Sequence, residues 1–168
     1  IRIIAIKKLK SQKILEDIAI NDKGYDVPRA AVQMIVDQNI ITNIATNALQ
    51  SKTREAAVSK LKDHIVIGDI AKNDEDKLVR ATAINFLINE DWLKDIVRNA
   101  KYSDAKEMAI LRIKDQQYLI NVVLNHNDTD IRKRAIINIT NQQVLQKLAK
   151  TDIQSEIRIA AIREIIDQ

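Results

Sequence analysis

The amino-acid sequence predicts an all-α protein. We expect a right-handed α-α superhelix of stacked antiparallel helix pairs, with about 6.5 repeats of 26 residues. Three observations predict this fold. An alanine recurs at a fixed period, two apolar stripes of helical spacing fill each period, and capping residues separate the stripes. The same register runs from end to end, so we expect residues 1–168 to form a single repeat domain. Its units begin near positions 1, 27, 53, 79, 105, 131 and 157.

The recurring alanine defines the register. In every unit a β-branched residue follows it, and a Leu or Ile comes four positions after it. No insertion or deletion interrupts the series, which consists of Ala5, Ala31, Ala57, Ala83, Ala109, Ala135 and Ala161. An unbroken series of this kind is typical of a solenoid, in which each unit packs only on its neighbours.

Each period contains two helix-sized stripes. In the third unit the first stripe consists of Thr53, Ala57, Val58 and Leu61. The second stripe there consists of Val66, Ile67, Ile70 and Ala71. Both follow the spacing of one helix face. Helices of about ten residues are unstable alone in water, so stacking on neighbouring helices must hold them.

Capping residues mark where these helices start and stop. Seven positions between the stripes carry good N-cap residues for the second helix: Ser11, Asp37, Asp63, Asn89, Asp115, Asn141 and Asp167. We expect the second helices to end at Asn21, Asn47, Asn73, Asn99, Asn125 and Thr151, with asparagine taking a left-handed conformation. The next helices are expected to be capped by Ser51, Ser103, Thr129 and Ser155. Pro28 falls in a first helical turn, where a missing N–H costs little.

Composition agrees with helices and narrows the function. Two glycines and one proline leave little turn chemistry for a β fold, and 3% aromatic residues imply an aliphatic core. There is no cysteine for a thiolate zinc site or a disulfide. We find no apolar run long enough to span a membrane and no signal-peptide pattern, and we expect a cytoplasmic protein. The chain opens at Ile1 within a repeat, so we expect a longer natural array or ends that meet other chains.

The running pattern resembles the HEAT-like repeat. It is visible in IAKNDEDKLVRATAINFL (residues 70–87) and in LNHNDTDIRKRAIINI (residues 124–139). In that repeat an Asp-containing turn leads into a helix that opens Val-Arg. The 26-residue unit is short for this family and also resembles leucine-rich variant repeats. The resemblance implies that the Val-Arg helices line a concave face and that the Asn-terminated helices lie outside.

The resemblance also implies contacts between the turn aspartates and the helix arginines of adjacent units. The basic positions are Arg2, Arg54, Arg80, Lys106, Arg132 and Arg158. The acidic positions are Asp22, Asp74 and Asp152, and the series is incomplete where Ala48, Ala100 and His126 replace the aspartate. A basic row at helix starts could alternatively bind phosphate. Hydrogen bonds and ion pairs between repeats are the favoured interpretation.

No group of residues predicts catalysis, a cofactor or a metal site, and we expect a non-enzymatic protein. His64 and His126 belong to different phases of distant units and are predicted to lie at the surface. The pairs Asp74/Asp76 and Asp128/Asp130 lack the Gly turn and the ligand number of a calcium loop, and are interpreted as caps and turn formers. Trp92 occupies a core phase. The DNA glycosylases and bilin lyases that share HEAT-like folds need site residues that we do not find here.

A binding surface is predicted on the outward positions of the first helices. These are Lys7, Lys10, Arg29, Gln33, Glu55, Ser59, Lys62, Asn85, Ile88, Leu111, Lys114, Lys133, Ile137 and Arg163. The mixture of aliphatic and charged residues favours a protein or peptide partner. Two alternatives stay open. The aliphatic residues could instead contact adjacent helices, and the net charge of +4 with basic residues such as Lys8, Lys13 and Arg134 could serve nucleic-acid binding.

Overall fold

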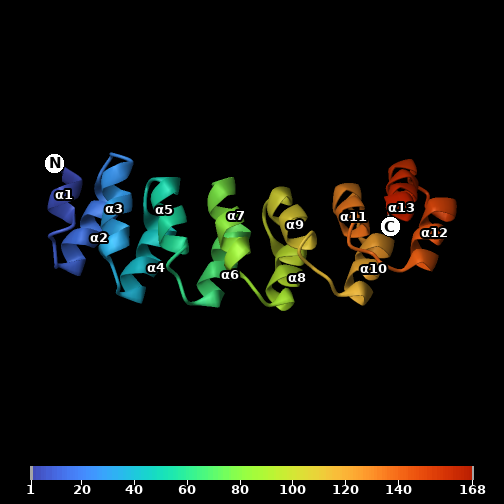
Figure 1. Ribbon diagram of the computed structural model, residues 1–168, viewed down its shortest axis with the longest axis horizontal. Coiled ribbons are helices and arrows are strands. Elements are labelled where there is room, and N and C mark those ends of the chain that lie inside the picture. The colour runs from blue at the N-terminus through green and yellow to red at the C-terminus, as the bar shows by residue number, and fades with distance from the viewer. Residues whose placement is uncertain (1, 168) are drawn as a thin grey trace. The chain divides into compact units, whose positions relative to one another are not determined.

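The computed structural model describes residues 2–167, which form α-helices and no strand (Figure 1). The odd-numbered helices are α1 (Arg2–Ile6), α3 (Asp26–Met34), α5 (Ser51–Val58), α7 (Lys77–Phe86), α9 (Ser103–Ile110), α11 (Thr129–Ile136) and α13 (Ser155–Asp167). The even-numbered helices are α2 (Gln12–Asn21), α4 (Gln38–Asn47), α6 (His64–Asn73), α8 (Glu90–Asn99), α10 (Gln116–Asn125) and α12 (Gln142–Thr151). The all-helical prediction is therefore confirmed.

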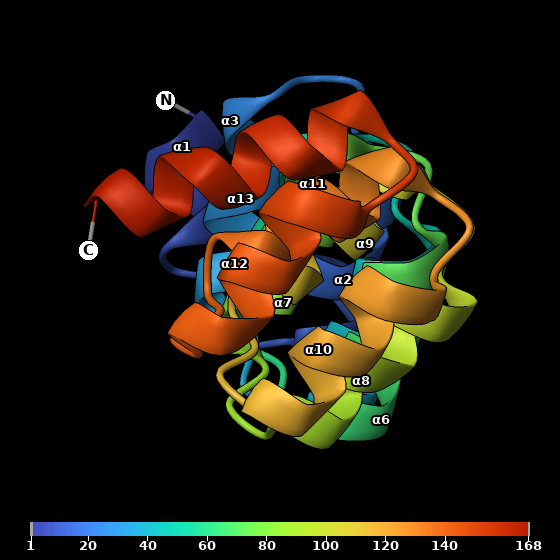
Figure 2. The same cartoon turned by 90° about the vertical axis from the view of Figure 1, so that its right-hand side faces the viewer.

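The chain divides into two compact units, Ile1–Ile88 and Asn89–Gln168. In both, each even-numbered helix packs against the odd-numbered helix that follows it, as α6 packs on α7 and α12 on α13. Odd-numbered helices also pack side by side, from α1 to α7 in the first unit and from α9 to α13 in the second. Figure 2 shows α13 beside both α11 and α12.

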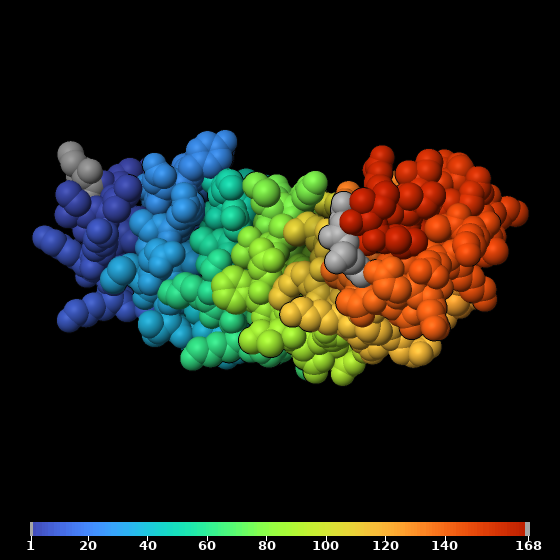
Figure 3. Space-filling model, turned by 45° about the vertical axis from the view of Figure 1, so that its right-hand side comes forward, coloured from blue at the N-terminus to red at the C-terminus, as the bar shows by residue number. Residues whose placement is uncertain are grey.

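The core of each unit is aliphatic, as predicted. The register alanines from Ala31 to Ala161 are fully buried, and the β-branched residues beside them are buried from Ile6 to Ile136. The space-filling view shows the side chains of successive helices in close contact within each unit (Figure 3). Ala5 is an exception to the prediction, because it is exposed on α1, whose main contact is with α3. Trp92 and Tyr118 are only half-buried.

The starts of the even-numbered helices are capped as the sequence predicts. Their N-cap side chains, which belong to Ser11, Asp37, Asp63, Asn89, Asp115 and Asn141, all accept hydrogen bonds from backbone N–H groups of the first turn. All six helices end at the predicted Asn or Thr. Pro28 lies in the first turn of α3. Asp167 is the last residue of α13 and its side chain lies outside the described residues, so its capping role stays a prediction.

Two predictions about the helix ends are wrong. The asparagines do not adopt a left-handed conformation, because within residues 2–167 no non-Gly residue has a positive φ. They remain helical instead, and Asn99 and Asn125 donate to Asp95 and Asn121 one turn earlier at 2.6 Å.

Ser51, Ser103, Thr129 and Ser155 are the first residues of their helices and not the N-caps. The N-cap lies one position earlier, at Gln50, Tyr102 or Asp128 in three of these helices. The physical reason is visible at α11, where the Asp128 carboxylate already accepts the free N–H groups of the first turn.

Candidate functional site

The predicted binding residues lie on the odd-numbered helices or directly after them. We call these residues the odd-helix row: Lys7, Lys10, Arg29, Gln33, Glu55, Ser59, Lys62, Asn85, Ile88, Leu111, Lys114, Lys133, Ile137 and Arg163. Twelve of them are exposed, and Glu55 and Lys133 are half-buried. The side chains of this row are therefore accessible along both units.

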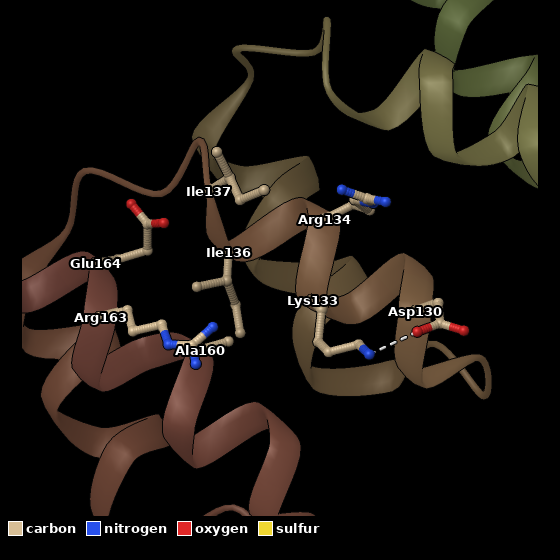
Figure 4. A pocket seen from close by; sticks show the side chains of 8 residues that line it. All are labelled: Asp130, Lys133, Arg134, Ile136, Ile137, Ala160, Arg163 and Glu164. Carbon is tan, nitrogen blue, oxygen red and sulfur yellow. Dashed lines mark ion pairs between the residues drawn. The ribbon is translucent and has the colours of Figure 1, made fainter. Parts of the chain in front are cut away.

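Two grooves between consecutive odd-numbered helices gather half of the row. The α3/α5 groove has a volume of about 270 Å³ and is lined by Arg29, Gln33, Lys52, Glu55, Ala56 and Ser59. The α11/α13 groove has a volume of about 320 Å³ and is lined by Asp130, Lys133, Arg134, Ile136, Ile137, Ala160, Arg163 and Glu164 (Figure 4). Row residues that line neither groove are Lys7, Lys10, Lys62, Asn85, Ile88, Leu111 and Lys114.

Several cations in and beside the grooves are paired with carboxylates of the same surface. The Lys133 ammonium lies 2.6 Å from the Asp130 carboxylate. The hydrogen bond that it donates lowers the pKa of Asp130 below its ordinary value. Arg134 lies 3.2 Å from Glu107, on α9. In the α3/α5 groove, Lys52 lies 3.1 Å from Glu55. Such internal pairing reduces the positive potential that a row of phosphates would require.

Aliphatic side chains of the row are partly or largely exposed. Ile88 is 86% exposed, Ile137 44% and Leu111 38%. Each of these residues follows an odd-numbered helix, where the chain turns toward the next even-numbered helix. Ile88 is therefore hardly covered by other helices, whereas Leu111 and Ile137 are more than half covered and keep an exposed part. The exposed parts of all three are accessible to a partner.

The arginines of the basic series at the starts of the odd-numbered helices make contacts within the fold. Arg54 Nε lies 2.8 Å from Asp74 of the α6–α7 turn, and the same arginine donates to the Ala48 carbonyl in the turn before its own helix. The pairs Arg132–Asp152 and Arg2–Asp22 repeat this contact in the predicted phase. Arg54, Arg80 and Arg132 are buried. The predicted arginine–aspartate contact is therefore confirmed at three positions.

A second set of contacts, between successive repeats, was not predicted from the sequence. Gln38, the first residue of α4, donates to the Lys60 carbonyl at 3.3 Å and accepts from the Lys62 N–H at 3.1 Å. Gln116 makes the same two bonds with Asn138 and Thr140. We call these contacts glutamine bridges. The glutamine recurs at this phase in Gln12, Gln38, Gln116 and Gln142, so the signal was present in the sequence.

The glutamine bridges position part of the odd-helix row. They hold short segments between an odd-numbered helix and its successor, such as the one that carries Lys62. In the second unit Glu90 takes the glutamine position and accepts from the Lys114 N–H at 3.0 Å. Lys60 adds a further contact, since its ammonium donates to the Val32, Gln33 and Ile35 carbonyls at the end of α3. Burial lowers the pKa of Lys60 below its ordinary value.

The remaining candidates for chemistry have structural roles. Asp76 and Asp128 cap α7 and α11, and Asp74 accepts from the Asp76 N–H, as predicted for caps and turn formers. His64 is exposed at the start of α6. His126 is half-buried, and its Nδ1 accepts a hydrogen bond from the Asp128 N–H at 3.0 Å. Asp74 accepts the equivalent bond from the Asp76 N–H two repeats earlier.

The described residues contain no group of three or more His, Cys, Asp or Glu side chains able to hold a metal ion. None of the helices that they form has the length and apolarity that crossing a membrane requires.

Comparison of the chain with protein families, with curated proteins and with solved structures finds no match.

Proposed function

We propose that this chain is a non-enzymatic scaffold that binds a protein or peptide partner along the odd-helix row. In this proposal its units form a HEAT-like, right-handed superhelix of 26-residue repeats, with the row on the concave face. The observation that carries the proposal is the exposed aliphatic side chains of the row, such as Ile88 and Leu111, among charges paired with one another. Protein interfaces combine apolar contact with a polar surround in this way.

The repeat assignment is supported by contacts that recur from unit to unit. Arginine–aspartate contacts and glutamine bridges each join one helix pair to the next. Contacts confined to neighbours are the property that lets a solenoid present an extended surface. In the proposal the odd-helix row lies on that surface. Most of the large aliphatic side chains of the repeats are buried in the core.

The proposal is tested by capture of a partner with matched variants of the full chain. Ile88→Asp with Leu111→Asp alters the row, and Ile65→Asp with Leu124→Asp makes the same change on exposed residues of the even-numbered helices. We expect the wild type and the even-helix variant to retain a partner protein through a wash at about 0.5 M salt, and the row variant to lose it. Equal capture by all three proteins, or capture of nothing, would contradict the proposal.

Nucleic-acid binding is the second candidate. It is favoured by the net charge of +4 and by Lys7 and Lys10, which are exposed near the start of the chain. Fluorescence anisotropy with short duplex and single-stranded DNA and RNA across a salt series distinguishes it. Micromolar binding that weakens steeply with salt would replace the protein scaffold as the proposed function. We expect no binding at about 50 mM salt.

A further inference from the structure

The two grooves of the odd-helix row differ in their linings. The α3/α5 groove has only polar or small side chains in its lining. In the α11/α13 groove, Ile136, Ile137 and Ala160 add apolar surface beside charged groups. Ile137 is partly exposed there, whereas its counterpart in the α3/α5 groove is Ser59. The α11/α13 groove therefore combines a surface for an aliphatic side chain with nearby charges in one concavity.

One cation of the α11/α13 groove has no carboxylate partner. Lys133 is paired with Asp130 and Arg134 with Glu107. Arg163, by contrast, forms no ion pair or side-chain hydrogen bond with the part of the chain that the structure describes. Figure 4 shows its guanidinium directed toward Ala160, in the space between α13 and α11. An exposed guanidinium with free donors binds a carboxylate through two parallel hydrogen bonds.

We propose that the α11/α13 groove binds a short segment of the partner in which an acidic side chain is next to an aliphatic one. The carboxylate pairs with Arg163, and the aliphatic side chain packs on Ile137 and Ala160. This inference rests on the proposed function, because it specifies which partner segment the odd-helix row selects. Charge complementarity selects the acidic residue of the segment, and apolar contact selects the aliphatic residue beside it.

The lining favours a carboxylate over the phosphates of a nucleic acid. Lys133 and Arg134 are paired with Asp130 and Glu107, so Arg163 is the cation of the lining that can bind one added anionic group, whereas a run of phosphates requires several. A nucleic-acid backbone also offers no aliphatic side chain for the surface at Ile137. A peptide satisfies both features of the groove with two adjacent residues.

The inference is tested by NMR titration of the ¹⁵N-labelled full chain with a defined peptide. The probe is an acetylated and amidated hexapeptide, Gly-Asp-Leu-Asp-Leu-Gly, and its control carries Asn in place of both Asp residues. We expect shift changes confined to α11 and α13, including the Nε–H signal of Arg163. Arg163→Gln and the Asn peptide should each weaken binding about tenfold. Arg29→Gln, a matched change in the α3/α5 groove, should leave the affinity unchanged.

Three outcomes of the peptide titration would overturn the inference. These are an absence of peptide binding up to about 1 mM, shifts located away from the groove, and an affinity that Arg163→Gln does not alter. Binding of a twelve-nucleotide oligodeoxythymidine at Arg163 would also overturn it, since the groove would then recognise phosphate. The three peptide results leave the capture experiment with the Ile88 and Leu111 variants unaffected, so failure of the inference and failure of the proposed function are distinguishable. Binding of the oligonucleotide would count against both.

Discussion

At the scale of single residues, burial distinguishes ion pairs that look alike in sequence. Arg2–Asp22 and Arg54–Asp74 occupy the same phase of two units, and their closest atoms lie 2.8 Å apart in both. The side chain of Arg2 is 74% exposed, whereas that of Arg54 is 7% exposed. The hydrogen bond to Asp74 raises the pKa of Arg54 above its ordinary value. Water screens the charge of the exposed Arg2, so its pair with Asp22 contributes less to stability, although the Asp22 side chain is itself only 13% exposed. Removing one member of the fully buried pair leaves the other charge without compensation.

We therefore predict unequal effects for the same substitution at these two positions. Arg54→Gln should lower the free energy of unfolding by about 3–5 kcal/mol, because the buried Asp74 carboxylate loses its partner. Arg2→Gln should lower it by at most about 1 kcal/mol. Urea denaturation followed by circular dichroism measures both. Adding Asp74→Asn to the Arg54 variant should recover part of the loss, and equal effects of the two single variants would contradict the assignment.

A second residue-scale prediction concerns pH. The hydrogen bond from Lys94 to Asp115, 2.7 Å long, lowers the pKa of the Asp115 carboxyl and raises that of the Lys94 ammonium. A lowered carboxyl pKa means that the unfolded chain binds more protons in acid. The resulting stability is present above the ordinary value of 3.8 and is lost as pH falls through the lower folded value. The lysine contribution is present below 10.5 and is lost as pH rises through its folded value.

Asp115→Asn should therefore be less stable than the wild type at pH 7, and the difference should shrink as the pH falls below 3.8 and through the lower pKa of the folded state. Asparagine still caps α10, so the change isolates the charge. The urea midpoint measured across pH checks this expectation. Asp37→Asn is the matched control, because Asp37 caps α4 in the same way and Glu16 stands at the phase that Lys94 occupies. If both variants respond equally to pH, the ion pair is not the cause.

At the scale of helices, the sequence predicted the even-numbered elements better than the odd-numbered ones. All six even-numbered helices start and end where the caps and terminal Asn or Thr predict, because these signals act within one turn of the chain. The starts of the odd-numbered helices were placed one residue late. Two of the four hydroxyl residues bind across repeats instead, Ser51 to Asp76 and Thr129 to Gln154. A single sequence does not distinguish a local cap from a contact 25 residues away.

The candidate site shows the same division. Helical angle alone predicted which residues of the odd-numbered helices are exposed, because that follows from one helix at a time. The grooves depend on how the side chains of two helices pack together, as Arg163 of α13 and Ile137 beside α11 do. The glutamine bridges were missed because their partners are backbone groups, which carry no sequence signal of their own.

One prediction at this scale uses His64, one of the two residues that replace glutamine at this phase. His64 occupies the place of Gln38 and Gln116 at the start of α6. His64→Gln should form a bridge to the segment after α7 and increase the free energy of unfolding by about 0.5–1.5 kcal/mol. The reverse change, Gln38→His, should reduce it by a similar amount. Urea midpoints of the two variants check both signs, and a destabilising His64→Gln would show that the bridges do not act independently of their surroundings.

At the scale of the molecule, contacts are short in sequence even though they cross repeats. Helices pack on the next one or two elements, and the arginine–aspartate contacts and glutamine bridges span fewer than 30 residues. Residues 1–88 and 89–168 consequently form separate compact units. Nothing in the sequence marks this division, since the alanine register passes through it unchanged from Ala83 to Ala109.

We predict that residues 1–88 and 89–168, expressed separately, each fold into a helical protein. Each keeps its own aliphatic core and its own buried arginine–aspartate contact, Arg54–Asp74 in the first and Arg132–Asp152 in the second. A repeat array requires only neighbouring contacts for stability, and each fragment retains the contacts within its own unit. Circular dichroism and cooperative urea unfolding of the two fragments test this expectation. As a control, the two fragments made by a cut between Ala71 and Lys72, inside α6, should fold less well. If fragment 1–88 or fragment 89–168 is disordered, its stability depends on the other.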